Sequence, residues 1–598
     1  MEQVWLKHYS DEAISKQVSD SEITCYEMLA RTAALSPDKT AILCDSGKLT
    51  FADLLGKIDV VSKSFQCLGI KKGDVVAIYM NTSVESITCF YALNKIGAIS
   101  FLLNSMHSTS VVEMCIERTN PKLIVASEAD LKRLLGVINK SDNIIAIVCE
   151  SSKLGFFSRY RSWVCSEKSR VLTWRGFVNL GVSSPLEKQA SASTTNEPSN
   201  DEPSNMENDS EMVDVTMKAY ADDPTLMIFS GASIGVRSIA VFNSVALNTK
   251  AHNCNISFVQ FARIPSDEFE KRAVVLSVTE LSNGFGIAFS VHMMLANALT
   301  IVIPSGYDGK SVAKAIRKFQ PNIFVAYPTW MYEEAENPVM KNIDLSCIKI
   351  VIAGGSKFPP LQKQKVEEFL KDHGSDAVIQ VGYGLSELLS LCTITPPNKY
   401  SSKSVGIPFL GTMIKIVNPE TQEELPFGAQ GEICICSPSQ LMCFYGESEQ
   451  TDCLIRRHRD GRYWVHTGDN GYLDEDGYLY YCGSNKRSVK VRDITVFPTV
   501  AEEAIAGVVG VSEVVVIPRE KNGETYLHAI VAPDESLLFD EEALSELKAR
   551  IFAECESMLL PYTRPKSIEY KVYLPRNHRG EIDYRKVMEE DLKADSDA

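Results

Sequence analysis

The sequence predicts an α/β protein with a large N-terminal body of mixed and parallel sheets flanked by helices, followed by a small, mobile α+β C-terminal domain. Short apolar runs alternate with amphipathic segments in the first 150 residues and again after residue 220, which is typical of βαβ units. After Leu473 this alternation gives way to paired strands and one amphipathic helix. Because 598 residues also exceed a single hydrophobic core, we expect domains at 1–482 and 483–598.

The apolar runs give the strands of the predicted body. In its first part we expect a helix at Ser83–Lys95 among strands at Val75–Met80, Ile99–Leu103, Leu123–Ala126 and Ile144–Cys149. After the break in the pattern, strands are expected at Leu226–Phe229, Ile323–Ala326 and Ile348–Ile352.

Residues 184–214 separate the two halves of the body and differ from both in composition. The segment is rich in Ser, Asn, Glu and Pro, and its eight acidic residues and one lysine give it a net charge of −7. It cannot bury enough apolar surface to offset its chain entropy, so we expect a disordered acidic insertion. A role as an acidic docking segment is the alternative.

The stretch Leu281–Tyr307 carries no formally charged residue and is long enough to cross a bilayer. It also contains Asn283, Gly284 and Pro304, and no second span or basic flank accompanies it. We therefore expect a buried helix followed by a strand at Leu299–Ile303.

The C-terminal region is expected to begin with a strand at Tyr478–Tyr481. A capping box at Thr499–Glu502, directly after Pro498, predicts the start of a helix. The turn Asn522-Gly523 predicts a strand pair formed by Val511–Ile517 and Tyr526–Val531. A second helix is expected to bury one face, formed by Leu544, Leu547, Ile551 and Cys555.

The net charge and the cysteine spacing exclude some classes of protein and favour others. A net charge of −16 argues against a nucleic-acid partner, because phosphate contacts need a basic surface. The 16 cysteines show no C-x-x-C spacing and the nine histidines are dispersed, so no zinc pattern is visible. With no signal peptide in Met1–Ser10, we expect reduced thiols in a cytoplasmic protein. Peripheral contact with a membrane is left open.

The segment Phe229–Arg237 follows an apolar strand and combines glycines, hydroxyls and a cation. Backbone N–H groups at such a turn can bind phosphate oxygens, with charge added by Arg237. We expect phosphate contacts from Ser230, Gly231, Ser233 and Arg237. An ordinary turn explains the same residues equally well.

Two further segments place an aromatic ring, hydroxyls and carboxylates near glycines. In Gln380–Glu387, Tyr383 can stack on a base, Ser386 can bind a phosphate and Glu387 can hold Mg²⁺. In Tyr463–Asp469, the carboxylate of Asp469 follows a glycine and can bind ribose hydroxyls.

In this order, the three segments resemble the adenylate-forming superfamily of acyl-CoA synthetases, luciferases and peptide-synthetase adenylation domains. The resemblance covers nearly the whole chain outside 184–214 and is closest to long-chain fatty acyl-CoA ligases. Supporting stretches are Thr50–Leu54, Ala353–Ser356, Gly406–Pro408, Gly431–Ile433 and Leu574–Arg576.

The resemblance implies a two-step reaction with ATP, Mg²⁺ and CoA. A fatty or other carboxylic acid attacks the α-phosphorus of ATP to give acyl-AMP and pyrophosphate, and CoA then displaces AMP after the C-terminal domain rotates. By this resemblance, Lys486 matches the hinge residue between the two domains, and Glu387 matches the residue that binds Mg²⁺. The adenine, acyl and phosphate contacts would come from Gly354, Gly355, Ser356, Gly382, Tyr383, Gly384 and Ser386, with Asp469 on the ribose.

The sequence departs from the family pattern in both half-reactions. Ile234 replaces a phosphate-loop glycine, which is a steric objection where a positive φ is needed. Asn283 replaces a histidine beside the acyl pocket, and Ser484 replaces an arginine that reaches the nucleotide. Asp493 replaces the glycine that lets pantetheine pass and should repel CoA phosphates.

The largest departure is at Glu581, which stands where the family has the lysine that bridges carboxylate and α-phosphate. Losing such a preorganised group costs about 3–4 kcal/mol in the transition state, and a reversed charge should cost more. We therefore expect impaired ligase activity. The alternatives are a specialised ligase with a substitute cation (Arg579 or Arg585), a non-catalytic protein that binds nucleotide or acyl groups, and an acyl-AMP ligase that stops before CoA.

Overall fold

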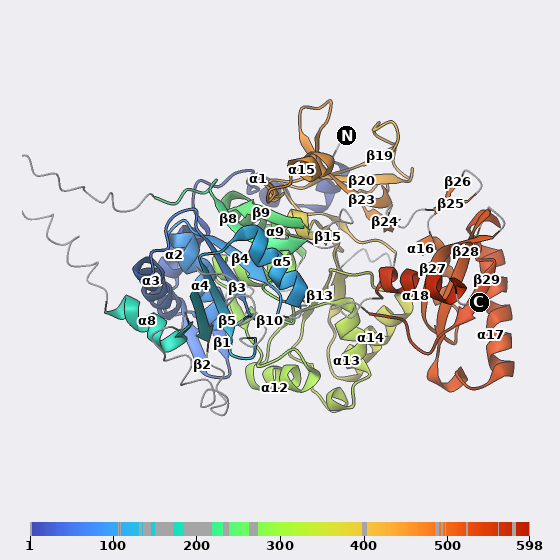
Figure 1. The fold of residues 1–598 in the computed structure, drawn as a ribbon, viewed down its shortest axis with the longest axis horizontal. Helices are drawn as coiled ribbons and strands as arrows, with labels where there is room; N and C mark the ends of the chain where they lie inside the picture. Colours follow the sequence, from blue (N-terminus) through green and yellow to red (C-terminus); the bar gives the residue numbers. More distant parts are fainter. Residues whose placement is uncertain are drawn as a thin grey trace, which may run out of the picture.

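Two sheets rich in parallel strands form the centre of the computed structural model, with helices packed around them (Figure 1). The predicted α/β class, with a large body and a smaller α+β unit at the C-terminal end, is confirmed. The structure describes residues 3–105, 107, 109–130, 134, 145–149, 171–183, 218–230, 238–261, 273–397, 403–484, 489–491, 494–496, 498–521, 524–559, 561–576 and 582–596. The predicted insertion at 184–214 and the turn Asn522-Gly523 lie outside these residues.

The first sheet has eight strands in the order β21-β9-β8-β4-β3-β5-β6-β7. The strands from β8 to β7 run parallel, whereas β9 and β21 join the edge antiparallel. Their bounds are β3 Val75–Tyr79, β4 Ile99–Leu103, β5 Leu123–Ser127, β6 Ile145–Cys149, β7 Val171–Thr173, β8 Pro224–Ser230, β9 Ser238–Asn243 and β21 Cys443–Phe444.

The second sheet has seven strands in the order β14-β13-β12-β10-β11-β1-β2, and only β2 is antiparallel to its neighbour. Their bounds are β1 Thr40–Cys44, β2 Gly47–Thr50, β10 Val274–Ser277, β11 Thr300–Val302, β12 Ile323–Ala326, β13 Ile350–Ala353 and β14 Val378–Val381. The central strands of both sheets are buried on both faces, which explains why they were visible as continuous apolar runs.

A third, antiparallel sheet has the order β19-β20-β23-β22, with β24 also paired to β23. Its bounds are β19 Met413–Val417, β20 Gly431–Cys436, β22 Ile455–Arg457, β23 Tyr463–Leu473 and β24 Leu479–Ser484. Short two-stranded pairs connect the sheets: β15 Gly384–Leu385 with β16 Ser390–Leu391, and β17 Thr393–Ile394 with β18 Ile407–Pro408. The predicted domain boundary at residues 482–483 falls inside β24 and stays a prediction.

Several helices of the body start where the sequence encodes a cap. The side chains of Thr24, Thr50 and Ser83 each form a capping box at the first turn of the helix that follows. The helices of the body are α1 Asp11–Ser15, α2 Cys25–Leu35, α3 Phe51–Cys67, α4 Val84–Lys95, α5 Thr109–Thr119, α8 Trp174–Val182, α9 Ser244–Phe261, α11 Met294–Ala296, α12 Gly309–Phe319, α13 Pro328–Ala335, α14 Pro360–Asp372 and α15 Ser448–Leu454. Single 3-10 turns occur at Val4–His8, Pro338–Met340 and Ser386–Leu388.

The apolar stretch from Leu281 onward is a core element, as expected. It forms a π-helix, η3 (Phe285–Met293), followed by α11 and the strand β11, and every residue of the π-helix is buried. Within the described residues, the structure contains no helix with the length and apolarity of a membrane span.

The C-terminal helices and strands form a separate group at one end of the molecule (Figure 1). A three-stranded sheet, β27-β28-β29, packs against three helices of the group, α16, α17 and α18, and a small hairpin, β25-β26, precedes it. The bounds are β25 Val489–Val491, β26 Ile494–Val496, α16 Pro498–Ala506, β27 Val511–Lys521, β28 Glu524–Pro533, α17 Glu541–Met558, β29 Ser567–Tyr570 and α18 Tyr584–Ser596, with 3-10 turns at Glu535–Leu537 and Pro561–Thr563.

The predicted capping box at Thr499–Glu502 is wrong. Helix α16 already begins at Pro498, which suits a first helical position because its missing N–H needs no partner. The Thr499 hydroxyl instead donates to the carbonyl of Cys482 at 3.2 Å, and Glu502 accepts from the backbone N–H of Val516 at 2.7 Å. Both side chains therefore tie the helix to neighbouring strands.

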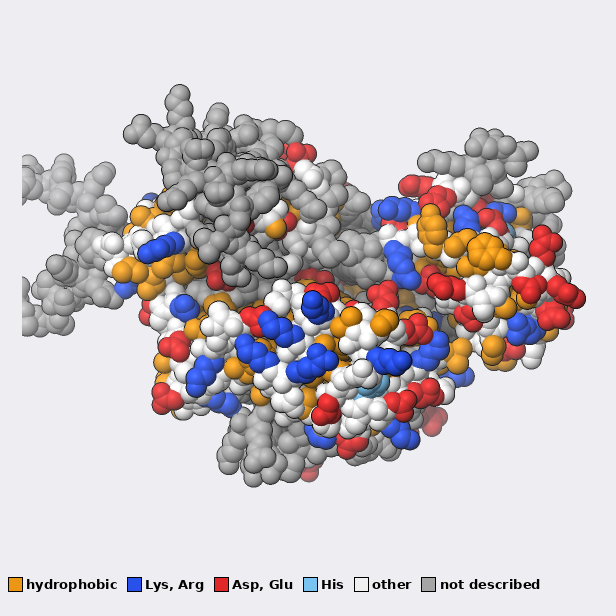
Figure 2. Space-filling model, turned by 90° about the horizontal axis from the view of Figure 1, so that it is seen from below, with side chains coloured by type: hydrophobic (Ala, Val, Ile, Leu, Met, Phe, Trp, Pro, Cys, Tyr) orange, Lys and Arg blue, Asp and Glu red, His pale blue; other side chains and the backbone are white. Residues whose placement is uncertain are grey.

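Acidic and basic side chains are interspersed over the described part of the face seen in Figure 2. Lys314 pairs with Asp45 at 2.6 Å, and Lys365 pairs with Glu336 at 3.3 Å. These exposed pairs are solvated and contribute little to stability.

We predict that Gly181→Ala destabilises the body. Gly181 of α8 lies against α3, where its N–H donates to Ser64 Oγ at 3.1 Å, and an added Cβ would lie 2.1 Å from the carbonyl oxygen of Val60. The two helices would have to separate, at a cost of about 1–3 kcal/mol in the free energy of unfolding. Urea denaturation measures this change.

Gly56→Ala is the matched control, because Gly56 lies on the exposed side of α3 and an added methyl group there would have no neighbour within 4 Å. This substitution should stabilise the protein by about 0.5–1 kcal/mol through helix propensity. A Gly181→Ala variant as stable as Gly56→Ala would contradict the close packing of α3 and α8.

Candidate functional site

The predicted site residues that the structure describes gather at the carboxyl ends of parallel strands. Ser230 is the last residue of β8, Gly354 follows β13, and Gly382 follows β14. Asp469 lies on β23 of the third sheet, beside the segment that follows β14. Ligands of open α/β sheets bind at this edge, because backbone groups and side chains of several loops converge there.

A buried hydrogen bond joins the first and second sheets at this edge. Ser230 Oγ donates to Glu387 Oε1 at 2.7 Å, and Glu387 is 0% exposed. The backbone carbonyl of Glu387 also accepts from the N–H of Leu441 at 2.9 Å. The start of the predicted phosphate segment is therefore fixed to the predicted metal ligand.

A second hydrogen bond joins Tyr383 to Asp469. The Tyr383 hydroxyl donates to Asp469 Oδ2 at 2.7 Å, and its ring lies 5.7 Å from that of Tyr481. Burial, followed by the nearby charge of Asp469, raises the pKa of Tyr383 well above its ordinary value, so the hydroxyl stays a donor. The ring and the carboxylate assigned to base and ribose thus lie together.

Glycine is required where strands of this edge approach one another. A Cβ at Gly384 would lie 1.9 Å from the carbonyl oxygen of Ser390, and one at Gly382 would lie 2.6 Å from that of Thr393. Gly354 and Gly355 follow β13, and Ser356 Oγ is buried without a hydrogen-bond partner among the described residues. This hydroxyl is therefore available to a ligand.

The backbone after Glu387 adopts an unfavourable conformation. Leu389 and Ser390 have φ values of 53° and 96°, in the left-handed region that favours glycine. Such residues persist only where the surrounding structure holds them, and they occur often at functional sites. Here the strain lets the chain turn back sharply between β15 and β16.

Asn283 belongs to a closed polar group on the acyl side of the edge. Its Nδ2 donates to the Tyr327 hydroxyl at 2.8 Å and to Glu280 Oε2 at 3.2 Å, and Tyr327 donates to the same Glu280 oxygen at 2.8 Å. The Tyr327 ring lies against Gly355, where a Cβ would be 3.0 Å away. Asn283 is therefore hydrogen-bonded within the protein and fixes one wall of the predicted acyl site.

Ser484 directs its hydroxyl to the protein backbone. On β24 it pairs with Asp469, and its Oγ donates to the carbonyl of Gly468 at 3.3 Å. It supplies neither the length nor the charge of the arginine expected here.

A family model described as AMP-binding enzyme matches residues 29–445, which is more than half of the chain. The chain belongs to the AMP-binding enzyme family. It is an acyl-CoA synthetase-like member of the adenylate-forming proteins, so the resemblance identified from its motifs is confirmed.

Relatives and solved structures agree with this assignment. The long-chain-fatty-acid–CoA ligase of Bacillus subtilis (strain 168) is 25% identical over 598 residues, covering 98% of both chains. The probable 4-coumarate–CoA ligase 1 of Dictyostelium discoideum is 24% identical over 497 residues, covering 81% of each. The anthranilate CoA ligase AuaEII in complex with anthranoyl-AMP has a TM-score of 0.76 at 18% identity, covering 96% of this chain and 98% of that one. ATP-bound MatB from Rhodopseudomonas palustris has a TM-score of 0.74 at 19% identity, covering 96% and 99%.

Part of the predicted site of this AMP-binding protein lies outside the described residues. These positions are Gly231, Ser233, Ile234, Arg237, Lys486, Asp493 and Glu581. The antiparallel pairing of Ser230 with Ser238 nevertheless fixes both ends of the phosphate segment. Ser238 donates to Glu447, which also accepts from Arg118, so the second end is held as firmly as the first.

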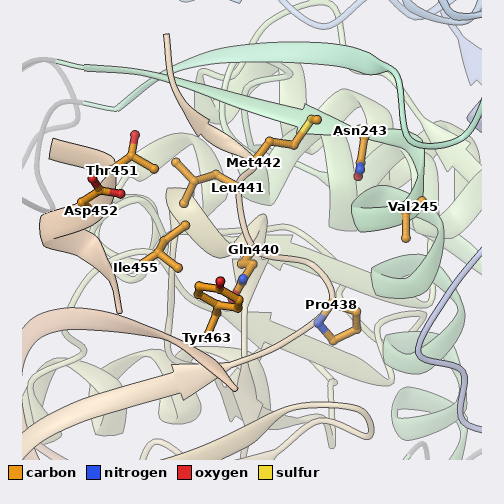
Figure 3. A pocket seen from close by; sticks show the side chains of 10 residues that line it. All are labelled: Asn243, Val245, Pro438, Gln440, Leu441, Met442, Thr451, Asp452, Ile455 and Tyr463. Atoms are coloured by element: carbon orange, nitrogen blue, oxygen red, sulfur yellow. The ribbon is translucent and has the colours of Figure 1, made fainter. Parts of the chain in front are cut away.

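A cavity of about 380 Å³ opens elsewhere, between the start of α9 and the strands of the third sheet (Figure 3). Its lining residues are Asn243, Val245, Pro438, Gln440, Leu441, Met442, Thr451, Asp452, Ile455 and Tyr463. The predicted nucleotide residues do not line it. We therefore place the candidate site by its chemistry, at the sheet edge, rather than by this cavity.

Sequence reasoning did not identify Tyr327, Glu280, Tyr481 or Glu447 as neighbours of the site. Tyr327, Tyr481 and Glu447 come from elements remote in sequence from the residues that they contact, and Glu280, although three residues from Asn283, stands in no distinctive motif. Alternation along β24 was the available signal for Tyr481, which lies close to the residues of β23.

We predict that Tyr383 and Asp469 are energetically coupled in the ligand-free protein. Tyr383→Phe and Asp469→Asn each weaken the 2.7 Å hydrogen bond, so the double variant should be less destabilised than the sum of the two. The expected coupling is about 0.5–3 kcal/mol in the free energy of unfolding, measured by urea denaturation of all four proteins. Strict additivity would show that the bond is absent in solution.

We also predict that His292 makes the stability of the fold depend on pH. Burial lowers the pKa of His292 from 6.5 to about 3, while Tyr91 and Asn248 bind its two nitrogens at 3.0 and 2.8 Å. Between these pH values the unfolded chain takes up a proton that the folded protein excludes. Stability therefore falls as pH decreases below 6.5, by up to about 1.4 kcal/mol per pH unit from this residue.

His292→Gln removes this contribution. The variant is expected to be less stable at pH 7.5 but to lose less stability than the native protein between pH 6.5 and 5. Parallel pH profiles for the two proteins, measured by urea denaturation, would refute a neutral buried His292.

Proposed function

We propose that this protein binds ATP and a fatty or related carboxylic acid as an acyl-CoA synthetase-like, adenylate-forming protein, and that its ligase activity is impaired. The observation that carries the binding part is the 2.7 Å contact between Tyr383 and Asp469, since it joins the groups suited to an adenine ring and ribose hydroxyls. The buried pair of Ser230 and Glu387 stands at the position suited to phosphates.

The side-chain oxygens at this sheet edge are suited to bind Mg²⁺. Mg²⁺ prefers carboxylate and hydroxyl oxygens and is usually held by one or two carboxylates together with substrate phosphates. Glu387 would hold it, with Ser230 beside it, and the ion would neutralise charge on the phosphates of ATP. The Ser230 hydroxyl donates to one oxygen of Glu387, so the two side chains already lie together.

The proposed acid is a fatty acid, on the basis of the relatives. Two relatives that span nearly the whole chain are long-chain-fatty-acid–CoA ligases, from Bacillus subtilis and Salmonella typhimurium. The acyl site would lie between Asn283, Tyr327 and Gly355, next to the buried Phe285.

We propose impairment because other residues stand at positions where the family has a lysine or an arginine. Such cations stabilise the negative charge that develops on the phosphates during the reaction. Glu581 stands for the lysine of the adenylation step, and Ser484 uses its hydroxyl on the Gly468 carbonyl. A carboxylate at position 581 repels the α-phosphate that the lysine would stabilise. Asp493 would repel the phosphates of CoA in the second step, so we expect CoA to bind more weakly than ATP.

A non-catalytic protein that binds nucleotide or acyl groups is the second candidate. The same replacements favour this candidate, because each half-reaction would lack one of the family's functional residues while the Tyr383–Asp469 hydrogen bond is present. An acyl-AMP ligase that stops before CoA ranks last, since Glu581 affects adenylation itself. A cytoplasmic location is also proposed, supported by the free thiols of fourteen cysteines in the part of the chain that the structure describes.

The test measures ATP–pyrophosphate exchange across a panel of fatty and aryl acids for the native protein and Glu581→Lys. We expect slow exchange by the native protein and an increase of at least about 100-fold in the variant, which corresponds to about 2.7 kcal/mol. Glu581→Gln is the matched control, since it removes the negative charge without adding a cation, and it should restore less activity.

Calorimetric titration of ATP separates binding from catalysis. The native protein should bind ATP, and Asp469→Ala should bind it at least about tenfold more weakly. Binding with no exchange in the native protein or in Glu581→Lys would favour the non-catalytic candidate. Exchange by the native protein at the rate of Glu581→Lys would overturn the proposed impairment.

A further inference from the structure

Three metal-ligating side chains meet on the third sheet, and none of them is among the residues assigned to nucleotide or acid. Cys434 lies on β20, His466 lies opposite it on β23, and His458 lies in the turn between β22 and β23. One ligand atom from each lies within 4.8 Å of the other two. The sequence shows no zinc pattern because the pairing of the strands, and not a short motif, brings the three together.

A carboxylate fixes the orientation of the His466 ring. Glu432 Oε2 lies 2.9 Å from His466 Nδ1, and a carboxylate can only accept, so Nδ1 carries the proton. The lone pair of His466 is therefore on Nε2, as in histidines that bind metals with a carboxylate behind them.

Only one of the other two ligand atoms faces this lone pair. His458 Nε2 lies 2.9 Å from His466 Nε2, whereas Cys434 Sγ lies 3.6 Å from Nδ1 and 3.9 Å from Nε2, beside the ring. Tetrahedral zinc separates neighbouring nitrogen and sulfur ligands by about 3.5 Å, so the Cys434 side chain would have to rotate toward Nε2 to bind the same ion. His458 is half-buried, which leaves room for water as a fourth ligand.

Side chains of both charges surround the cluster. Lys415 is held over the Trp464 ring at 3.9 Å, and Asp460 lies 3.9 Å from Lys415. Burial, followed by the charge of Glu432, raises the pKa of the Cys434 thiol well above its ordinary value, so zinc must displace the thiol proton when it binds.

We propose that Cys434, His458 and His466 bind Zn²⁺, with Glu432 orienting His466. One thiolate and two imidazoles are ligands that zinc prefers over Mg²⁺ or Ca²⁺, so this site is chemically distinct from Glu387. The site also reaches the nucleotide edge, because Glu432 Oε1 accepts from the N–H of Gly468 at 3.0 Å, next to Asp469. A bound ion would brace the strand pair that carries Asp469.

The test uses the full chain, stripped with chelator and titrated with zinc chloride against a chromophoric chelator. We expect one tight zinc per chain, counted independently by elemental analysis. Cys434→Ser and His458→Asn should each weaken binding at least tenfold, and Glu432→Gln about 10–100-fold. Cys436→Ser is the matched control, two residues along β20, and should bind zinc like the native protein.

Cobalt chloride gives a second readout that distinguishes this site from zinc bound to other cysteines. Co²⁺ at the site should show a thiolate charge-transfer band, and this band should be absent in Cys434→Ser but present in Cys436→Ser. Because His458 lies in a half-buried turn, His458→Asn should fold normally, which near-ultraviolet circular dichroism checks. Absence of tight zinc in the native protein, or unchanged zinc and cobalt binding in both Cys434→Ser and His458→Asn, would overturn the proposal.

Discussion

A carboxyl group buried away from solvent is the constraint around which the candidate site is organised. Glu387 is 0% exposed, and burial of such a group is costly unless donors surround it. The end of β8 supplies Ser230 as a donor, while the N–H of Leu441 binds the backbone of the same residue. Three segments must therefore hold fixed positions relative to one another, and the left-handed backbone at Leu389 and Ser390 shows how tightly the chain is turned to allow it.

The sequence was sufficient to predict those features whose physical cause lies within a short segment of the chain. Strands such as Ile99–Leu103 and Ile323–Ala326 were predicted with their observed bounds, because strands buried on both faces are continuous apolar runs. The Gly382–Glu387 segment was identified because glycine, an aromatic ring and a carboxylate occur together in it. Local signals also misled, since Thr499 fits a capping box but bonds to Cys482 instead.

What the sequence did not reveal depends on contacts between distant segments. The partners of Asn283 come from Glu280 and Tyr327, and nothing in the motif around Asn283 points to the second of these. His458 meets Cys434 only through the register of β20, β22 and β23. Pairing between strands is decided by the whole sheet, so single-sequence patterns carry little information about it.

The contacts within the candidate site are compatible with the proposed impairment of catalysis. The Tyr383–Asp469 bond and the polar group around Asn283 satisfy buried side chains within the chain itself, so they stabilise the fold with or without a substrate. A lysine or arginine at a reaction centre is of a second kind, because it stabilises the transition state rather than the folded protein. Ser484 and Glu581, the replacements on which the proposed impairment rests, stand at positions of this second kind.

The pairing of β1 with β11 has a consequence for how the chain folds during synthesis. Thr300 donates its hydroxyl to the carbonyl of Thr40, a contact between positions 260 residues apart, and β1 lies between β11 and β2 in the second sheet. During synthesis β1 can pair with β2 at once, but its other edge stays unpaired until β11 has been made, about halfway along the chain. Contacts of such long range slow folding, and an exposed strand edge is prone to aggregation in the meantime.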